Sequence, residues 1–202
     1  MNHSRLLKIT LINFSIGASA VRNQGNGIAE PIRERLRKEL SVPIFFKNLK
    51  HKSERRFDNY LNEMTDKITG LKGISNNDNP SGMVQWGTAR KCVNLLFRSV
   101  VYNGFMWEEF RIKKADFRSG GLIDKLEVPL DSYIVKGIKR DCKKFKKIEF
   151  DSTLYSSFSI IGLDKEIESP YYQNIASLIA QKRNICRVDL DMRYWRNQEL
   201  LD

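Results

Sequence analysis

The chain has 202 residues, enough for one substantial core, and its 35 Lys and Arg against 24 Asp and Glu give a formal charge of +11. This basic excess favours a polyanionic partner, although a basic solvated surface is the alternative. Three cysteines and two histidines do not suit an all-thiolate metal centre or Ser-His-Asp catalysis. Catalysis is therefore expected to use Lys, Asp, Glu or Tyr, with no metal.

The cysteines indicate a reducing compartment. Cys92, Cys142 and Cys186 are odd in number and far apart, so they predict buried free thiols in a cytoplasmic protein rather than a disulfide framework. The apolar stretch at 5–21 is interrupted by polar residues and is too short for a bilayer helix, so no membrane partner is expected. A signal peptide there is the alternative, because the stretch ends in a possible cleavage sequence.

Two segments of the first third carry helix signals. Residues 27–40 (GIAEPIRERLRKEL) predict an amphipathic helix with Pro31 in its first turn, where the missing amide hydrogen is tolerated. Residues 53–68 place apolar side chains three and four positions apart, behind Ser53 as the expected cap. Both helices are interpreted as scaffold.

Turn-forming residues interrupt this helical pattern twice. The Gly, Asn, Asp, Ser and Pro residues of 73–82 predict the clearest break in the chain. The sequence RSGG at 118–121 predicts another turn.

The last part of the chain also predicts mostly helix. Residues 169–184 begin with Ser169 as a cap and Pro at the first helical position. The basic run KRDCKKFKK at 139–147 is interpreted as a solvated face, with phosphate contact as the alternative. Short strands are expected only near 148–152 or 186–190. The fold class is therefore mainly α.

The segment SGMVQWGTARKCVNLL, which begins at residue 81, joins glycine turns to a helix. Gly82 and Gly87 are both predicted to turn before the helix starts, and glycines let backbone amides approach a phosphate closely. Gly87, Thr88 and Arg90 are therefore candidate contacts to a DNA backbone. Lys91 follows in the first helical turns, where its stem can enter a cleft; a solvated lysine is the alternative.

An aspartate with core-like neighbours follows in EVPLDSYIVKGI, residues 127–138. Asp131 comes after Pro129 and Leu130 and just before an apolar run that starts at Tyr133. An ionised side chain is costly to desolvate unless it is paired, so this position needs a reason. Asp131 either caps the following helix or is kept as a catalytic carboxylate, and one residue can do both.

Together, these two segments resemble the helix-hairpin-helix GPD superfamily of base-excision DNA glycosylases. That family has a glycine-bearing hairpin followed by a catalytic lysine, and then an apolar-Pro-apolar-Asp-Thr-His-Val motif with the catalytic aspartate. Here glycine turns precede Lys91, and PLDSYI with Asp131 stands at the second motif. The stretches SAVRNQGNG and RVDLDMRYWRNQ are similar to divergent prokaryotic members, which include Brig-type phage-defence glycosylases.

The resemblance implies an enzyme that cleaves N-glycosidic bonds without a cofactor. It implies a mainly α fold in which two helical lobes flank a DNA-binding cleft around a helix-hairpin-helix GPD-like core. The substrate is a damaged or modified base flipped out of double-stranded DNA. A modified cytosine of phage DNA and an oxidised purine are both open, as are DNA repair and phage defence. Protein partners stay open.

One glycosylase-like unit is expected over 1–202. Within it, an N-terminal helical lobe covers 1–72, the hairpin and GPD-like segment covers 82–138, and a C-terminal helical part covers 139–202.

The resemblance also assigns roles to individual residues. Asp131 stabilises the positive charge that develops on the sugar, and Lys91 is the second catalytic residue. If Lys91 attacks the sugar as a Schiff-base nucleophile, the enzyme is also an AP lyase; otherwise Lys91 orients DNA or water. The expected DNA contacts are Gly87, Thr88, Arg90 and Lys136. The expected base pocket consists of Arg22, Asn23, Gln24, Trp86 and Tyr133.

Two other functions compete with this interpretation. A nonenzymatic DNA- or RNA-binding module would use the same hairpin, helix ends and basic surface for phosphate contacts. A magnesium nuclease would use Asp189 and Asp191, whose alternation in RVDLDMRYW is also explained by salt bridges.

Overall fold

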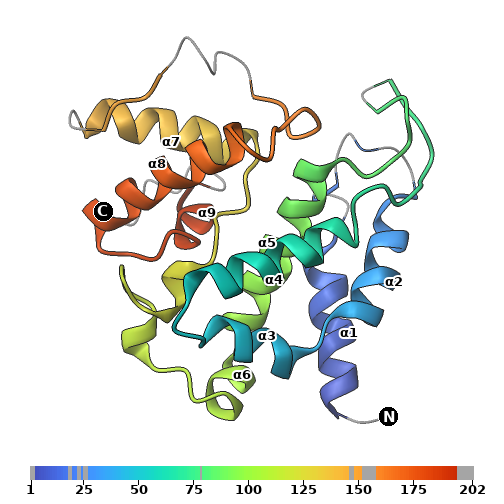
Figure 1. The fold of residues 1–202 in the computed structure, drawn as a ribbon, viewed down its shortest axis with the longest axis horizontal. Coiled ribbons are helices and arrows are strands. Elements are labelled where there is room, and N and C mark those ends of the chain that lie inside the picture. Colours follow the sequence, from blue (N-terminus) through green and yellow to red (C-terminus); the bar gives the residue numbers. More distant parts are fainter. Residues whose placement is uncertain are drawn as a thin grey trace. The chain divides into compact units, whose positions relative to one another are not determined.

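The computed structural model describes residues 3–17, 20–21, 24, 27–77, 79–145, 148–151 and 158–194 (Figure 1). The chain forms two compact units, Met1–Ile112 and Lys113–Asp202, called the N-terminal and C-terminal units below. The expected mainly α character is confirmed, since the described residues form helices and one isolated β-bridge, between Lys72 and Met83, but no strand. None of the helices in these ranges is long and apolar enough to cross a membrane.

The helices of the N-terminal unit pack around α5. Its described elements are α1 (His3–Ser15), α2 (Ala29–Glu39), α3 (Val42–Leu49), α4 (Glu54–Asp66), α5 (Trp86–Val101) and α6 (Gly104–Glu109). Helix α5 contacts α1, α4 and α6. The helices predicted at 27–40 and 53–68 are confirmed as α2 and α4. Pro31 lies in the first turn of α2 as expected, whereas the side chain of Ser53 makes no capping bond to α4.

Aromatic rings form the centre of the N-terminal unit. The Phe45 ring lies 4.5 Å from Phe97 and 6.2 Å from Phe57, measured between centroids, and all three side chains are buried. Phe46 stacks on Phe110 at 4.2 Å, which joins α3 to the turn after α6. This core explains the apolar stripe of α4, because Phe57 belongs to both.

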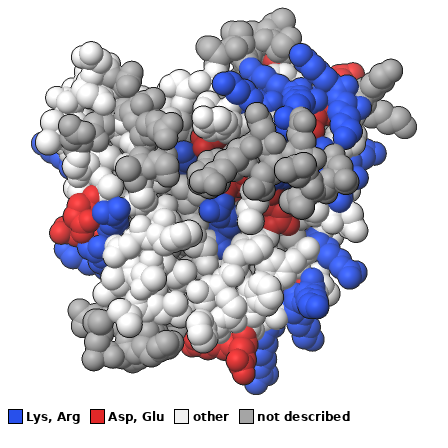
Figure 2. All heavy atoms as spheres, turned by 180° about the vertical axis from the view of Figure 1, so that it is seen from behind, with Lys and Arg blue, Asp and Glu red and all other residues white. Residues whose placement is uncertain are grey.

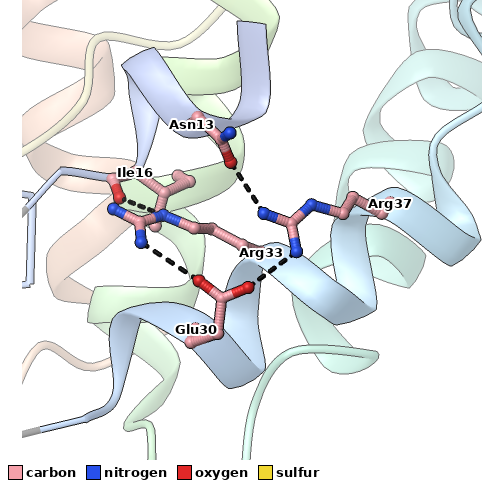
Figure 3. Close-up of polar contacts among 5 residues, drawn as sticks. All are labelled: Asn13, Ile16, Glu30, Arg33 and Arg37. Carbon is pink, nitrogen blue, oxygen red and sulfur yellow. Dashed lines mark hydrogen bonds and ion pairs between the residues drawn. The ribbon is translucent and has the colours of Figure 1, made fainter. Parts of the chain in front are cut away.

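Two arginines of α2 tie that helix to α1 at the surface (Figure 3). The Arg33 guanidinium donates from Nε to the Ile16 carbonyl at 2.9 Å, which satisfies a carbonyl just beyond the end of α1. Arg37 donates to Asn13 at 2.8 Å, and both arginines pair with Glu30. These charge-assisted bonds lower the pKa of Glu30, and the bond from Arg37 has a larger effect than the bond from Arg33.

The predicted break at 73–82 is confirmed as the loop of a hairpin between α4 and α5. Gly73 donates its amide to the Gly82 carbonyl at 2.8 Å, and Val84 donates to Leu71 at 2.8 Å. Gly82 has a φ of 62°, and a Cβ there would lie 2.9 Å from the Ser75 nitrogen. The turn expected at Gly82 is therefore present and specifically requires glycine.

The turn predicted at Gly87 is wrong. Helix α5 begins at Trp86, one residue before Gly87, which is helical and buried. Gln85 takes the extended capping position, and its carbonyl accepts the first helical bond from Ala89 at 3.0 Å. A glycine in the first turn does not end a helix whose cap precedes it.

In the described part of the C-terminal unit, three α-helices pack on one another and two short 3-10 helices contact each other (Figure 1). Its described elements are η1 (Lys114–Asp116), η2 (Leu122–Lys125), α7 (Ser132–Lys144), α8 (Glu168–Arg183) and α9 (Asp189–Tyr194). The turn at 118–121 is confirmed, because Gly121 donates its amide to Arg118 and Gly120 has a φ of 76°.

Two details of the last segments differ from expectation. The helix predicted at 169–184 is present as α8, but it begins at Glu168, and Ser169 is a buried first-turn residue rather than a cap. Its amide donates to the Asp164 carbonyl from the preceding loop. Residues 186–190 form a turn and the start of α9 instead of a strand, since the Asp189 carboxylate accepts the Cys186 amide at 3.1 Å. The starts of α8 and α9 both depend on hydrogen bonds to loop residues, which local helix propensity does not predict.

A buried carboxylate links the three α-helices of the C-terminal unit. Asp141 of α7 accepts two 2.9 Å bonds from the Arg183 guanidinium of α8. The Tyr194 hydroxyl of α9 donates to the same carboxylate at 2.7 Å. The exposed fractions of the Asp141 and Arg183 side chains are only 4% and 12%. Burial, followed by the bond to Asp141, raises the pKa of Tyr194, so its hydroxyl remains a donor at neutral pH.

The close contact of α7 with α9 predicts a sharp effect of Gly137→Ala. A Cβ at Gly137 would lie 2.3 Å from Cγ of the Tyr194 ring, which cannot move without losing its bond to Asp141. We expect the free energy of unfolding to fall by about 1–3 kcal/mol, measured by urea denaturation. The matched control is Gly162→Ala, where a Cβ meets nothing within 4 Å. Equal stability of the two variants would contradict this packing.

Candidate functional site

The segment that leads into α7 is held by a buried glutamine. Gln173 of α8 accepts the Val128 amide at 3.1 Å and donates to the Val128 carbonyl at 2.8 Å. Val128, Pro129 and Leu130 are themselves buried. Two bonds from one side chain replace the pairing that a neighbouring strand would give, so the backbone before Asp131 is fixed.

Asp131 is the N-cap of α7. Its backbone is extended, and Oδ1 accepts the amides of Tyr133 at 2.9 Å and Ile134 at 3.0 Å. The expectation that this residue caps the helix is confirmed. The side chain is half-buried at the N-terminus of α7, where its two bonds give the carboxylate a defined position. Its catalytic role stays a prediction.

The exposed side of α7 is uniformly basic. Its charged side chains are the half-buried Lys139 and the exposed Lys136, Arg140, Lys143 and Lys144. At about 100° per residue they share one face, opposite the buried Ile134, Ile138 and Asp141. Figure 2 shows Lys and Arg side chains gathered in the part of the C-terminal unit that contains α7. These five cations are called the α7 basic face below.

Aromatic rings accompany three of these cations. The Lys136 ammonium lies 6.0 Å from the centroid of Tyr133, Lys139 lies 5.5 Å from Phe150, and Arg140 lies 6.0 Å from Tyr194. The face of an aromatic ring attracts a cation, so these contacts limit where the long side chains point. Tyr133 itself is 50% exposed.

The residues assigned to DNA contacts lie in different environments. Arg90 is only 7% exposed, and it donates to Asn62 at 2.8 Å and Thr65 at 3.2 Å, which links α5 to α4. Gly87 and Thr88 are also buried in the N-terminal unit. Lys136, in contrast, is exposed on the α7 basic face.

Lys91 is half-buried near the start of α5. It belongs to the N-terminal unit, whereas Asp131 belongs to the C-terminal unit. The pairing of these two side chains across a cleft stays a prediction.

The residues assigned to the base pocket are also divided. Arg22 and Asn23 lie outside the described residues. Gln24 is fully buried beside the hairpin loop, where its carbonyl accepts the Asn79 side-chain amide at 3.1 Å. Among the described residues neither polar atom of the Gln24 side chain has a hydrogen-bond partner. Trp86 is half-buried beside Arg90, and Tyr133 is exposed on α7.

The acids proposed for metal chemistry form no recognisable metal site. Asp189 caps the turn before α9, burial raises its pKa to about 6, and Asp191 is buried nearby in sequence. Within the described ranges, no three His, Cys, Asp or Glu side chains are grouped to hold a metal ion.

The expectation of buried free thiols is confirmed for all three cysteines. Burial raises the pKa of Cys92 and Cys186 to about 12 and that of Cys142 to about 11, so all three are thiols at neutral pH. These cysteines are therefore poor nucleophiles and poor metal ligands.

Sequence reasoning missed two residues of this site. Gln173 was not singled out, and the buried Asp141 was included in a run interpreted as a solvated face. The helical period of SYIVKGIKRDCKK contains the missing signal, because Ile134, Ile138 and Asp141 follow one another at spacings of four and three. No comparable signal marks Gln173.

Comparison with known proteins adds no family assignment: no family model, no curated protein and no solved structure matches this chain.

The capping geometry predicts different effects for two substitutions of Asp131. Asp131→Ala removes the acceptor of two amides, so we expect a loss of about 1 kcal/mol in the free energy of unfolding. Asp131→Asn keeps an acceptor oxygen, so its free energy of unfolding is expected to differ from that of the wild type by only a few tenths of a kcal/mol. Urea denaturation measures both. If Asn destabilised as much as Ala, the charge rather than the cap would be the stabilising feature.

Proposed function

We propose that this protein binds double-stranded DNA through the α7 basic face. The supporting observation is a single helical face with five cations and no acid among its exposed charged side chains. Lys136 and Lys144 are eight residues apart, so the cations extend for about 12 Å along the helix. This length covers several successive phosphates of a DNA strand.

The chemistry of the face favours contact with phosphates over reading of bases. Four of its five cations are lysines, which act on phosphates as point charges, and it has no Asn or Gln to pair with adenine. Contact is therefore expected mainly with phosphates and driven by counterion release. The formal charge of +11 on the whole chain adds long-range attraction.

The charge pattern predicts the result of neutralising part of this face. We expect the combined change Lys136→Gln, Lys143→Gln and Lys144→Gln to weaken duplex binding about 10-fold or more. The slope of log affinity against log salt should fall by about 3, one for each lost contact. Fluorescence anisotropy with a labelled duplex at several salt concentrations measures both quantities.

The matched control neutralises Arg118, Lys165 and Lys182, three exposed cations of the same unit that lie outside α7. The control has the same net charge as the test variant and should keep the wild-type salt slope. An equal loss in both variants would show that net charge, and not α7, carries the binding. Tighter binding of duplex RNA than of DNA would contradict the DNA assignment.

The position of Asp131 favours a second, more specific function, that of a DNA glycosylase. A carboxylate fixed by two amides stands at the N-terminus of the helix that carries the α7 basic face. Cleavage of an N-glycosidic bond develops positive charge on the sugar, which such a carboxylate stabilises. The resemblance to the helix-hairpin-helix GPD superfamily adds Lys91, a two-lobed fold and a DNA-binding cleft to this proposal.

The glycosylase proposal predicts that one substitution will reduce base release without weakening DNA binding. Asp131→Asn keeps the cap and removes only the charge, so we expect duplex binding within about 2-fold and base release reduced at least about 100-fold. Mass spectrometry of bases released from oxidised, alkylated and phage-modified DNA measures the reaction. In the same reactions, borohydride should trap a covalent adduct with the wild type but not with Lys91→Gln if the enzyme is also a lyase.

Each result separates the alternatives. Full base release by Asp131→Asn would remove the catalytic assignment. DNA binding without any base release by the wild type would instead support a nonenzymatic DNA-binding module.

A further inference from the structure

One aromatic ring is left exposed beside the α7 basic face. Tyr133 is the only exposed aromatic side chain in the described part of the C-terminal unit. Its amide is held by Asp131 at 2.9 Å, so the ring projects from a fixed backbone position. Half of the side chain is exposed, so part of the ring is accessible to a ligand.

The charges around Tyr133 change sign along the helix. The row of cations begins one turn later at Lys136, whose ammonium lies 6.0 Å from the ring, whereas the Asp131 carboxylate caps the N-terminus of the helix, before Tyr133. A phosphate is attracted to Lys136 and repelled by Asp131. A DNA strand that follows the α7 basic face is therefore expected to turn its phosphates away at Tyr133 and to present a sugar or a base there.

A paired base cannot meet the ring, because its faces are covered by its neighbours in the duplex. An unpaired base has a free face that can stack on tyrosine, and every base has such a face. Stacking uses the face of the base and not its edge, so the contact with Tyr133 is expected to tolerate any base.

We propose that Tyr133 is a stacking platform for an unpaired base, so that the protein selects DNA with an unpaired nucleotide over continuous duplex, whatever the base. This inference rests on the proposed binding of DNA by α7. It adds a substrate class, duplex DNA interrupted by a single unpaired nucleotide, and a residue that determines it.

The test compares the full-length protein on a continuous duplex and on the same duplex with one bulged nucleotide. We expect the wild type to bind the bulged DNA about 10-fold more tightly, with similar values for bulged A, C, G and T. Tyr133→Ala should lose this preference while its affinity for the continuous duplex changes less than about 2-fold, and Tyr133→Phe should keep the preference. With 2-aminopurine as the bulged base, stacking quenches its fluorescence in the wild type and in Tyr133→Phe only.

The matched control is Phe105→Ala, which removes an exposed aromatic ring from the N-terminal unit and should leave the preference intact. Retention of the preference or of the quenching by Tyr133→Ala overturns the inference, as does an equal loss of affinity for both DNAs. In those cases binding by α7 still stands if the Lys136, Lys143 and Lys144 substitutions weaken it. Absence of binding by the wild type to either DNA overturns both.

Discussion

The buried pairing of Asp141 with Arg183 and Tyr194 determines the surface that the C-terminal unit presents. A buried charge is tolerated only when it is paired and hydrogen-bonded, and here three bonds from two helices satisfy one carboxylate. Removing one partner of such a pair typically costs about 3–5 kcal/mol, so the rotation of α7 about its own axis is strongly specified. Because Asp141 points inward, helical geometry turns Lys136, Lys143 and Lys144 outward. The basic face is thus a consequence of one buried acid.

Much of the fold follows from periodicity and turn chemistry alone. The apolar stripe of 53–68 predicts α4, and its members then meet Phe97 in the aromatic core. The errors all concern helix starts. Gly87 does not break α5 and Ser169 does not cap α8, because the starting bonds come from Gln85 and from the Asp164 carbonyl. Several nearby residues can cap a helix with similar energy, and tertiary contacts select among them.

Among the candidate site residues, the environment of some could be predicted from the sequence and that of others could not. The capping role of Asp131 is readable from its position before an apolar run, and Lys136 is readable as an exposed residue of an amphipathic helix. Arg90 is not, since its partners Asn62 and Thr65 are 28 and 25 residues away in the sequence. A charged residue at a helix start has the same local signal whether it meets a phosphate or a neighbouring helix. Only the packing of α4 on α5 distinguishes the two.

Helix capping alone does not explain why residue 131 is an aspartate and not a neutral capping residue. Asn and Ser cap helices about as well as Asp, and the helix dipole favours a charge there by at most about 1 kcal/mol. A negative charge at the N-terminus of α7 repels the phosphates that the proposed binding face would attract. A neutral cap would therefore serve a simple DNA-binding helix better. An ionised cap is advantageous when positive charge appears beside it, as happens on a sugar that is losing its base. Under the proposed glycosylase function, the carboxylate that caps the helix would also divert phosphates toward Lys136 and stabilise the reacting sugar, with no change in its own position.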